Sequence, residues 1–169
     1  MGKLKSKPLE TCIQEFRTAL EKGVNRIILI GENTGAYGID INLTLPTLLN
    51  ILIEIEGKYE IQLECLHPRW IITYLDELVK ILKTGKITTI DSPIQSGNSR
   101  ILKLMNRGYD AQTLRECLLK LKKAFSSSKT PHPYHHRIPF RDRKRFSRYI
   151  RFYKRDRVYY SSNFSFLLR

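Results

Sequence analysis

Apolar runs and amphipathic stretches alternate through the first 125 residues of the chain. The runs at residues 24–30, 59–66 and 87–90 are short and rich in β-branched side chains, which is typical of buried parallel strands. Between and after them, apolar residues recur every three or four positions, which predicts amphipathic helices. We expect helices between Pro8 and Gly23 and at residues 46–55, 72–82, 100–108 and 111–125.

Helices that separate successive strands predict right-handed βαβ units and a parallel sheet. Units of about 30 to 35 residues suit this repeat. Three of them fit into residues 1–125, which we expect to form one domain. The predicted fold class is therefore α/β, with a sheet that is either open or closed like a barrel.

The pattern stops at residue 126, and residues 126–169 form what we call the basic tail. Few of its residues are branched aliphatics, so it cannot build a core of its own, and we expect disorder or loose helix there. The net charge of the whole chain is +14, of which residues 1–125 carry +4 and the tail +10. Arg and Lys interleaved with Tyr and Phe predict nonspecific, salt-sensitive nucleic-acid binding by the tail.

The three cysteines are far apart in the sequence, which indicates neither a disulfide framework nor a paired metal site. A reducing cytoplasm fits this cysteine usage, and no apolar stretch is long enough to predict a membrane span. We therefore expect a cytoplasmic protein. No nucleophile–base arrangement predicts a catalytic residue, and the histidines of the tail have no carboxylate or cysteine partners nearby, so no metal site is predicted.

Three polar loops follow directly after the three predicted strands, at residues 31–34, 64–68 and 91–97. In parallel α/β folds ligands bind beyond the carboxyl ends of the strands, because the loops there face one crevice. Glu32 and Asp91 are carboxylates suited to holding a ligand amine or hydroxyl. Ser96 and Gly97 precede a helix whose backbone N–H groups can approach an anion. The sequence thus predicts a small-molecule site at this edge.

Residues 2–125 resemble the radical S-adenosylmethionine domain of the tRNA methylthiotransferases. The strongest match is PIQSGNSRILKLMNRGY, beginning at Pro93, which resembles the family's P-x-Q-S-G loop and the helix that follows. GENTGAYGIDI from Gly31, LHPRWI from Leu66 and KLKSKP from Lys3 resemble three further family segments. The GAYG segment is more similar to the branch acting on threonylcarbamoyl-adenosine than to the ribosomal-protein branch.

This resemblance implies a partial (β/α) barrel that holds S-adenosylmethionine against a [4Fe-4S] cluster. The implied substrate is tRNA with a modified adenosine next to the anticodon. The implied cofactor-binding residues lie in the three strand-end loops: Gly31, Glu32, Asn33, Glu64, Pro68, Gln95, Ser96 and Gly97. Asp91 stands where the family commonly has His.

The family's C-x-x-x-C-x-x-C cluster motif has no counterpart in this sequence. Three thiolates are needed to hold such a cluster while its fourth iron binds the cofactor. We therefore expect a truncated domain without cluster-dependent catalysis of its own. Two alternatives stay open: a small basic RNA-binding protein on an inactive α/β core, and one half of a split enzyme whose cluster motif is on a separate chain.

A frameshift offers an explanation for the basic tail. With suitable codons, residues 130–146 in a shifted frame become LHIHIIIGFP and SETEKDF, which resemble the family's next strand and its I-x-G-F-P-x-E-T loop. We expect that the gene is frameshifted near Phe125 and that the tail is an out-of-frame product. The nucleotide sequence of the gene tests this hypothesis directly.

Overall fold

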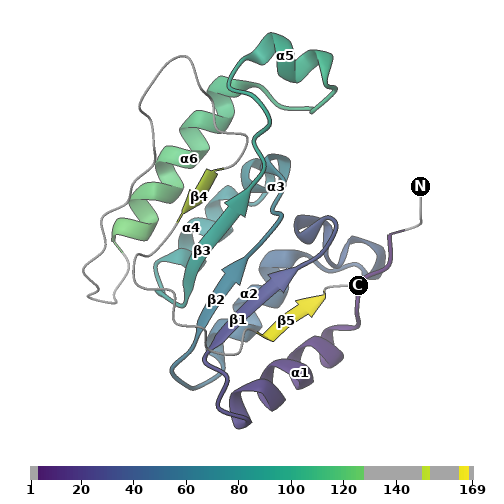
Figure 1. Ribbon diagram of the computed structural model, residues 1–169, viewed down its shortest axis with the longest axis vertical. Helices are drawn as coiled ribbons and strands as arrows, with labels where there is room; N and C mark the ends of the chain where they lie inside the picture. The colour runs from purple at the N-terminus through teal and green to yellow at the C-terminus, as the bar shows by residue number, and fades with distance from the viewer. Residues whose placement is uncertain (1–3, 128–149, 153–163, 168–169) are drawn as a thin grey trace.

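The computed structural model describes residues 4–127, 150–152 and 164–167 of the chain (Figure 1). Helices and strands alternate as the hydrophobic pattern predicts. The strands are β1 (Arg26–Ile30), β2 (Glu60–Leu63), β3 (Ile87–Ser92), β4 (Ile150–Phe152) and β5 (Phe164–Leu167). The α-helices are α1 (Leu9–Glu21), α2 (Leu45–Glu54), α3 (Pro68–Thr73), α4 (Leu75–Leu82), α5 (Ser99–Leu104) and α6 (Ala111–Ser126), and the 3-10 helices are η1 (Thr34–Ala36) and η2 (Ile39–Ile41).

The strands form one open sheet in the order β4-β3-β2-β1-β5. The neighbours β1, β2 and β3 are parallel, and β5 is parallel to β1 on the other side. β4 is antiparallel to β3 and forms the opposite edge. The three parallel strands confirm the predicted α/β class and are what a partial (β/α) barrel requires.

Two segments of the basic tail differ from the expected disorder or loose helix. Residues 150–152 and 164–167 are β4 and β5, which extend the sheet at its two edges. The physical reason is that β1 and β3 would otherwise present unpaired backbone N–H and C=O groups, and strands of many sequences can pair with them. The frameshift and nucleic-acid predictions concern mostly residues that lie outside the described ranges.

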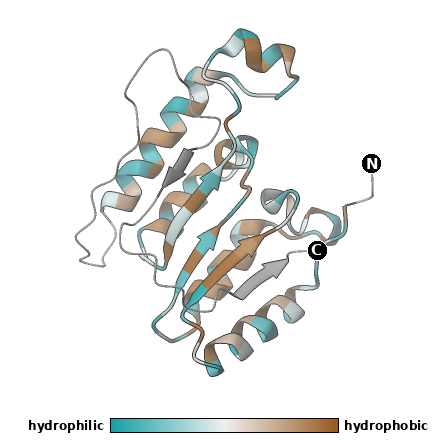
Figure 2. Ribbon diagram, in the orientation of Figure 1, coloured by the Kyte–Doolittle hydropathy of each residue, from teal (hydrophilic) through white to brown (hydrophobic). Residues whose placement is uncertain are grey.

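The helices cover one face of the sheet and bury the core against it. α2 packs against α1 and α4, and α4 packs against α6, so these helices form one layer. Ile27 and Leu29 of β1 and Ile61 and Leu63 of β2 are at most 2% exposed. Figure 2 shows the corresponding hydrophobic stretch along β1. Full burial of each such side chain contributes about 1.5–3 kcal/mol.

The opposite face of the sheet, here called the inner face, carries polar residues. Gln62 pairs in register with Ile28 of β1 and with Thr89 of β3. Because successive residues of a strand point to opposite faces, this row lies on the face away from the core residues Ile61 and Leu63. Glu64 and Asp91 lie two residues further along the same rows, at the carboxyl ends of β2 and β3. The inner face therefore delivers two carboxylates to the edge where the strands end.

The predicted helix at residues 72–82 is two helices. Tyr74 leaves helical geometry with φ −108° and ψ 25°, which separates α3 from α4. α3 begins earlier than predicted, at Pro68, where the missing N–H of proline breaks no helical hydrogen bond. The break lets α3 turn toward the carboxyl ends of the strands, where it contacts η1.

No single helix in the described part of the chain is long and apolar enough to cross a membrane. Residues 34–41 and α2 pass that test only as a pair, which is bent by 102°. Leu45, Leu48 and Leu49 of α2 are fully buried in the protein core.

Candidate functional site

The loops after β1 and β2 are joined by hydrogen bonds at the carboxyl edge of the sheet. Thr34 Oγ1 donates to the Glu64 carbonyl oxygen at 2.6 Å. Trp70 Nε1 donates to Asn33 Oδ1 at 2.8 Å. The Trp70 side chain also packs directly against Gly35. A Cβ added at Gly35 would lie 2.2–2.5 Å from three atoms of Trp70. The first two strand-end loops are thus one packed unit.

The loops after β2 and β3 are joined in the same way. The Leu66 N–H donates to the Asp91 carbonyl oxygen at 3.0 Å. The His67 and Tyr109 rings meet edge to face with their centroids 5.7 Å apart. Tyr109 then donates its hydroxyl to the Ile94 carbonyl at 3.2 Å. All three loops predicted from the sequence therefore lie at one edge and contact one another in series.

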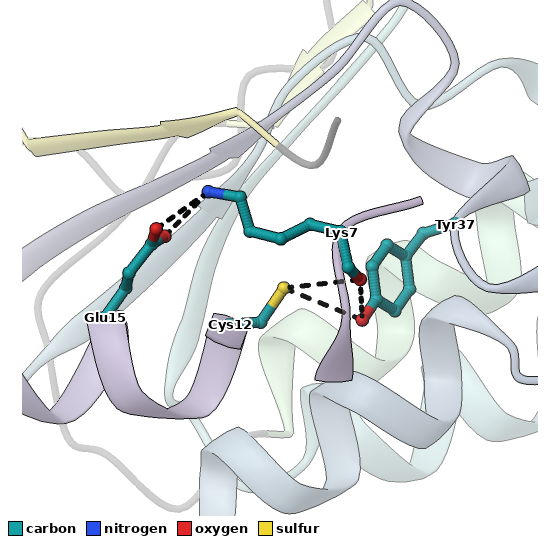
Figure 3. Close-up of polar contacts among 4 residues, drawn as sticks. All are labelled: Lys7, Cys12, Glu15 and Tyr37. Atoms are coloured by element: carbon teal, nitrogen blue, oxygen red, sulfur yellow. Dashed lines mark hydrogen bonds and ion pairs between the residues drawn. The ribbon is translucent and has the colours of Figure 1, made fainter. Parts of the chain in front are cut away.

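The segment before α1 is attached to the first loop (Figure 3). The Tyr37 hydroxyl donates to the Lys7 carbonyl at 3.1 Å, and Cys12 Sγ lies 3.6 Å from the same hydroxyl. Burial raises the pKa of Tyr37 above its ordinary value and likewise raises the pKa of Cys12. Both groups therefore stay protonated at neutral pH and serve as structural contacts.

Two further hydrogen bonds complete this attachment. Ser6 Oγ accepts from the Gly38 N–H at 2.9 Å, and the Ser6 N–H donates to Asp40 Oδ2 at 2.8 Å. Gly38 has φ +88°, a left-handed conformation that favours glycine. These contacts hold the segment before α1 against the residues that follow the first loop.

The predicted cofactor-binding residues all lie at or next to the carboxyl edge, with different exposures. Gly31 and Pro68 are buried, Glu32 and Asn33 are exposed, and the others are partly buried: Glu64, Gln95, Ser96 and Gly97. Several of them also hold the site together. Asn33 accepts from Trp70, Ser96 Oγ accepts from the Asn98 N–H at 3.1 Å, and Pro68 starts α3.

Two non-glycine residues at this edge have left-handed backbone conformations. Cys65, two residues after β2 ends, has φ +56°, and Gln95, three residues after β3 ends, has φ +63°. Such conformations cost about 1–3 kcal/mol each and cluster at functional sites. Their position after neighbouring strands supports the assignment of this edge as the functional site.

Sequence reasoning missed the residues that connect the loops, chiefly Thr34, Trp70 and Tyr109. Their contacts join segments more than ten residues apart, which periodicity cannot predict. The available signal was the resemblance itself, since all three lie inside the matched motifs.

The described residues do not fit the ligation of an iron–sulfur cluster. No group of three or more His, Cys, Asp or Glu side chains in this part of the chain converges to hold a metal ion. Cys12 and Cys117 are buried on the helices α1 and α6, which flank the layer on opposite sides, and Cys65 is exposed after β2 (Figure 1). These three thiols are not arranged as a cluster site.

Cys65 is expected to react with iodoacetamide in the folded protein while Cys12 and Cys117 stay protected. Burial, then Asp91 and Glu64, raise the pKa of the Cys65 thiol, so little of the reactive thiolate forms at neutral pH. Labelling of Cys65, followed by mass spectrometry as a function of pH, should therefore become fast only at a higher pH in the folded protein than in the protein unfolded in urea. Equal pH profiles in both states would contradict this environment for Cys65.

Comparison with known proteins identifies the family of this chain. The model of the radical SAM superfamily matches residues 1–150. The chain is 33% identical over 125 residues to the probable threonylcarbamoyladenosine tRNA methylthiotransferase of Pyrococcus abyssi, covering 73% of this chain and 29% of that protein. It is 36% identical over 125 residues to the ribosomal protein uS12 methylthiotransferase RimO of Caldanaerobacter subterraneus, covering 72% and 28%.

The chain thus spans less than a third of the length of these relatives. The matched region includes the three strand-end loops and the segment that attaches to the first of them. The resemblance seen in the motifs is confirmed: the chain belongs to the radical SAM superfamily, and the relatives it matches are methylthiotransferases.

Proposed function

We propose that this chain is the part of a tRNA methylthiotransferase that binds S-adenosylmethionine. The observation that carries the proposal is the joining of three polar loops at the carboxyl edge, through Thr34–Glu64, Trp70–Asn33 and Leu66–Asp91. The matched relatives include proteins named for tRNA and for ribosomal protein uS12. The GAYG segment, buried from Gly35 to Gly38, favours the branch named for threonylcarbamoyladenosine.

The chemistry of the edge suits the cofactor. Carboxylates of Glu32 and Glu64 are acceptors for the amino group of S-adenosylmethionine, and the backbone N–H groups near Gly97 are donors for its carboxylate. Gly31 lets the backbone approach the ligand closely after β1. When bound to a reduced cluster, the cofactor supplies a carbon radical for the reaction.

These 169 residues are proposed not to hold the cluster by themselves, which the spread of Cys12, Cys65 and Cys117 over three distant elements supports. One alternative is a split enzyme, in which a separate polypeptide carries the cluster cysteines. The 169-residue polypeptide alone would then bind the cofactor without cleaving it. The alternative of a basic RNA-binding protein rests on the tail charge of +10 and predicts salt-sensitive tRNA binding that is lost when residues 126–169 are removed.

Calorimetry of S-adenosylmethionine binding to the iron-free chain tests the cofactor site. We expect Glu64→Gln to weaken binding about tenfold, because a charged acceptor is replaced by a neutral amide. The backbone contact from Thr34 to residue 64 is kept in this variant. Glu54→Gln, on the exposed side of α2, is the matched control and should bind like the unaltered chain.

Reconstitution with iron and sulfide tests the origin of the cluster. The chain alone should show no absorbance of a [4Fe-4S] cluster. Co-expression with a polypeptide carrying C-x-x-x-C-x-x-C should give the cluster and, once an added reductant supplies the electron, cleavage of S-adenosylmethionine to methionine and 5′-deoxyadenosine. A stable cluster on the chain alone would overturn this part of the proposal, and equal cofactor binding by Glu64→Gln would overturn the first part.

A further inference from the structure

Basic and aromatic side chains gather beside the second and third loops, where α5 ends. His67 contacts Tyr109 edge to face, with ring centroids 5.7 Å apart. Arg69 lies over the Trp70 ring at 5.6 Å. Arg107 follows α5, held by its backbone N–H to the Leu102 carbonyl at 3.0 Å. Both arginines are near enough to His67 for their charges to lower the pKa of its ring.

One hydrogen-bond donor of Arg107 lacks an acceptor. Its Nε is buried and has no hydrogen-bond acceptor among the described residues. Neither Arg107 nor Arg69 forms an ion pair in the described part of the chain. Arg107 as a whole is partly exposed, so an anion bound beside it would balance the charge of a group whose buried Nε lacks an acceptor.

His67 adds a neutral donor to the same group. Its Nδ1 accepts from the Arg69 N–H at 3.2 Å, so the proton of the neutral ring lies on Nε2. Burial, with Arg107 and Arg69 nearby, lowers the pKa of His67 and keeps the ring neutral at pH 7. The cluster then offers donors only, which selects an anion.

We propose that His67, Arg69 and Arg107 bind a backbone phosphate of the RNA substrate. Two guanidinium groups match a phosphate, whose oxygens accept paired N–H donors, better than they match a single carboxylate. The partly exposed rings of His67 and Tyr109 provide surfaces of the kind on which unpaired bases stack. The inference rests on the proposed function only in taking the macromolecular substrate to be RNA.

Binding of unmodified tRNA to the iron-free full chain tests the proposal, measured by fluorescence anisotropy over a series of salt concentrations. Arg107→Gln is compared with Arg17→Gln, which removes the same charge from the exposed side of α1. We expect Arg107→Gln to weaken binding about five- to tenfold at low salt and to lower the slope of log K against log[salt] by roughly one contact. Arg17→Gln should leave both nearly unchanged.

Two further arms identify the source of the anion. Inorganic phosphate should compete with tRNA more effectively in the unaltered chain than in Arg107→Gln. If Arg107→Gln instead weakens S-adenosylmethionine binding and leaves tRNA binding unchanged, the cluster holds the cofactor carboxylate and the proposal fails. It also fails if Arg107→Gln and Arg17→Gln bind tRNA alike.

Folding defects are separated from lost contacts by two additional variants. Arg69→Gln alters an exposed side chain and should weaken tRNA binding in the same direction, while Arg107→Lys keeps the charge and should restore part of the affinity. A normal affinity of Arg69→Gln together with an unfolded Arg107→Gln would overturn the proposal. None of these measurements needs the iron–sulfur cluster. They therefore test RNA binding even if the assignment of the S-adenosylmethionine site is wrong.

Discussion

Gly35→Ala is expected to destabilise the fold by at least about 3 kcal/mol, because a methyl group at this position has no room. Its Cβ would lie 2.2–2.5 Å from Trp70, inside the contact that joins the first loop to α3. Either Trp70 moves and its hydrogen bond to Asn33 is lost, or the first loop separates from the second. Urea unfolding followed by the fluorescence of Trp70, the single tryptophan of the chain, measures both effects.

The control for this variant is Gly23→Ala. Gly23 has φ +80° but nothing within 4 Å of an added Cβ, so alanine there meets only the backbone cost of about 1–2 kcal/mol. Adding Trp70→Ala to Gly35→Ala should cost less than the two single changes together, since the clash disappears. Strict additivity, or equal losses for Gly35→Ala and Gly23→Ala, would show that the clash is absent in solution.

Leu63→Ala is expected to lower the free energy of unfolding by about 3–4 kcal/mol. Leu63 is fully buried at the end of the central strand, where it packs under the helix layer and precedes Glu64. The lost methyl groups leave a cavity that neighbouring parallel strands cannot close. Because β2 carries the second loop, the variant should also weaken S-adenosylmethionine binding.

Leu104→Ala removes the same atoms from a side chain that is 74% exposed. Its stability should stay within about 0.5 kcal/mol of the unaltered chain in chemical denaturation. A comparable loss for both leucines would mean that Leu63 does not occupy the core position described here.

The hydrophobic pattern predicted the strands better than the helices. β1, β2 and most of β3 lie inside the predicted runs, because β-branched side chains buried on the helix-facing side leave little choice of conformation. The split between α3 and α4 was missed. Nothing in the apolar spacing marks Tyr74, whose conformation follows from α3 turning toward the first loop, a tertiary effect.

The candidate site was predictable at the level of loops and not of contacts. Strand-end rules placed residues 31–34, 64–68 and 91–97 together, and the structure brings these segments to one edge. The rules could not show that Asn33 holds Trp70 or that the charge of Arg107 lowers the pKa of His67. Such pairings depend on side-chain packing between segments distant in sequence, which local patterns do not encode.

The attachment of Ser6 to Gly38 and Asp40 decides where foreign segments can be joined to this protein. The chain enters the fold beside the first loop, so an affinity tag or fusion partner added before it would be held close to the carboxyl edge. Such a tag would compete sterically with ligands for that edge and, if it contained histidines, would bring metal-binding groups to it. Binding measurements on this protein are therefore best made after any amino-terminal tag has been cleaved.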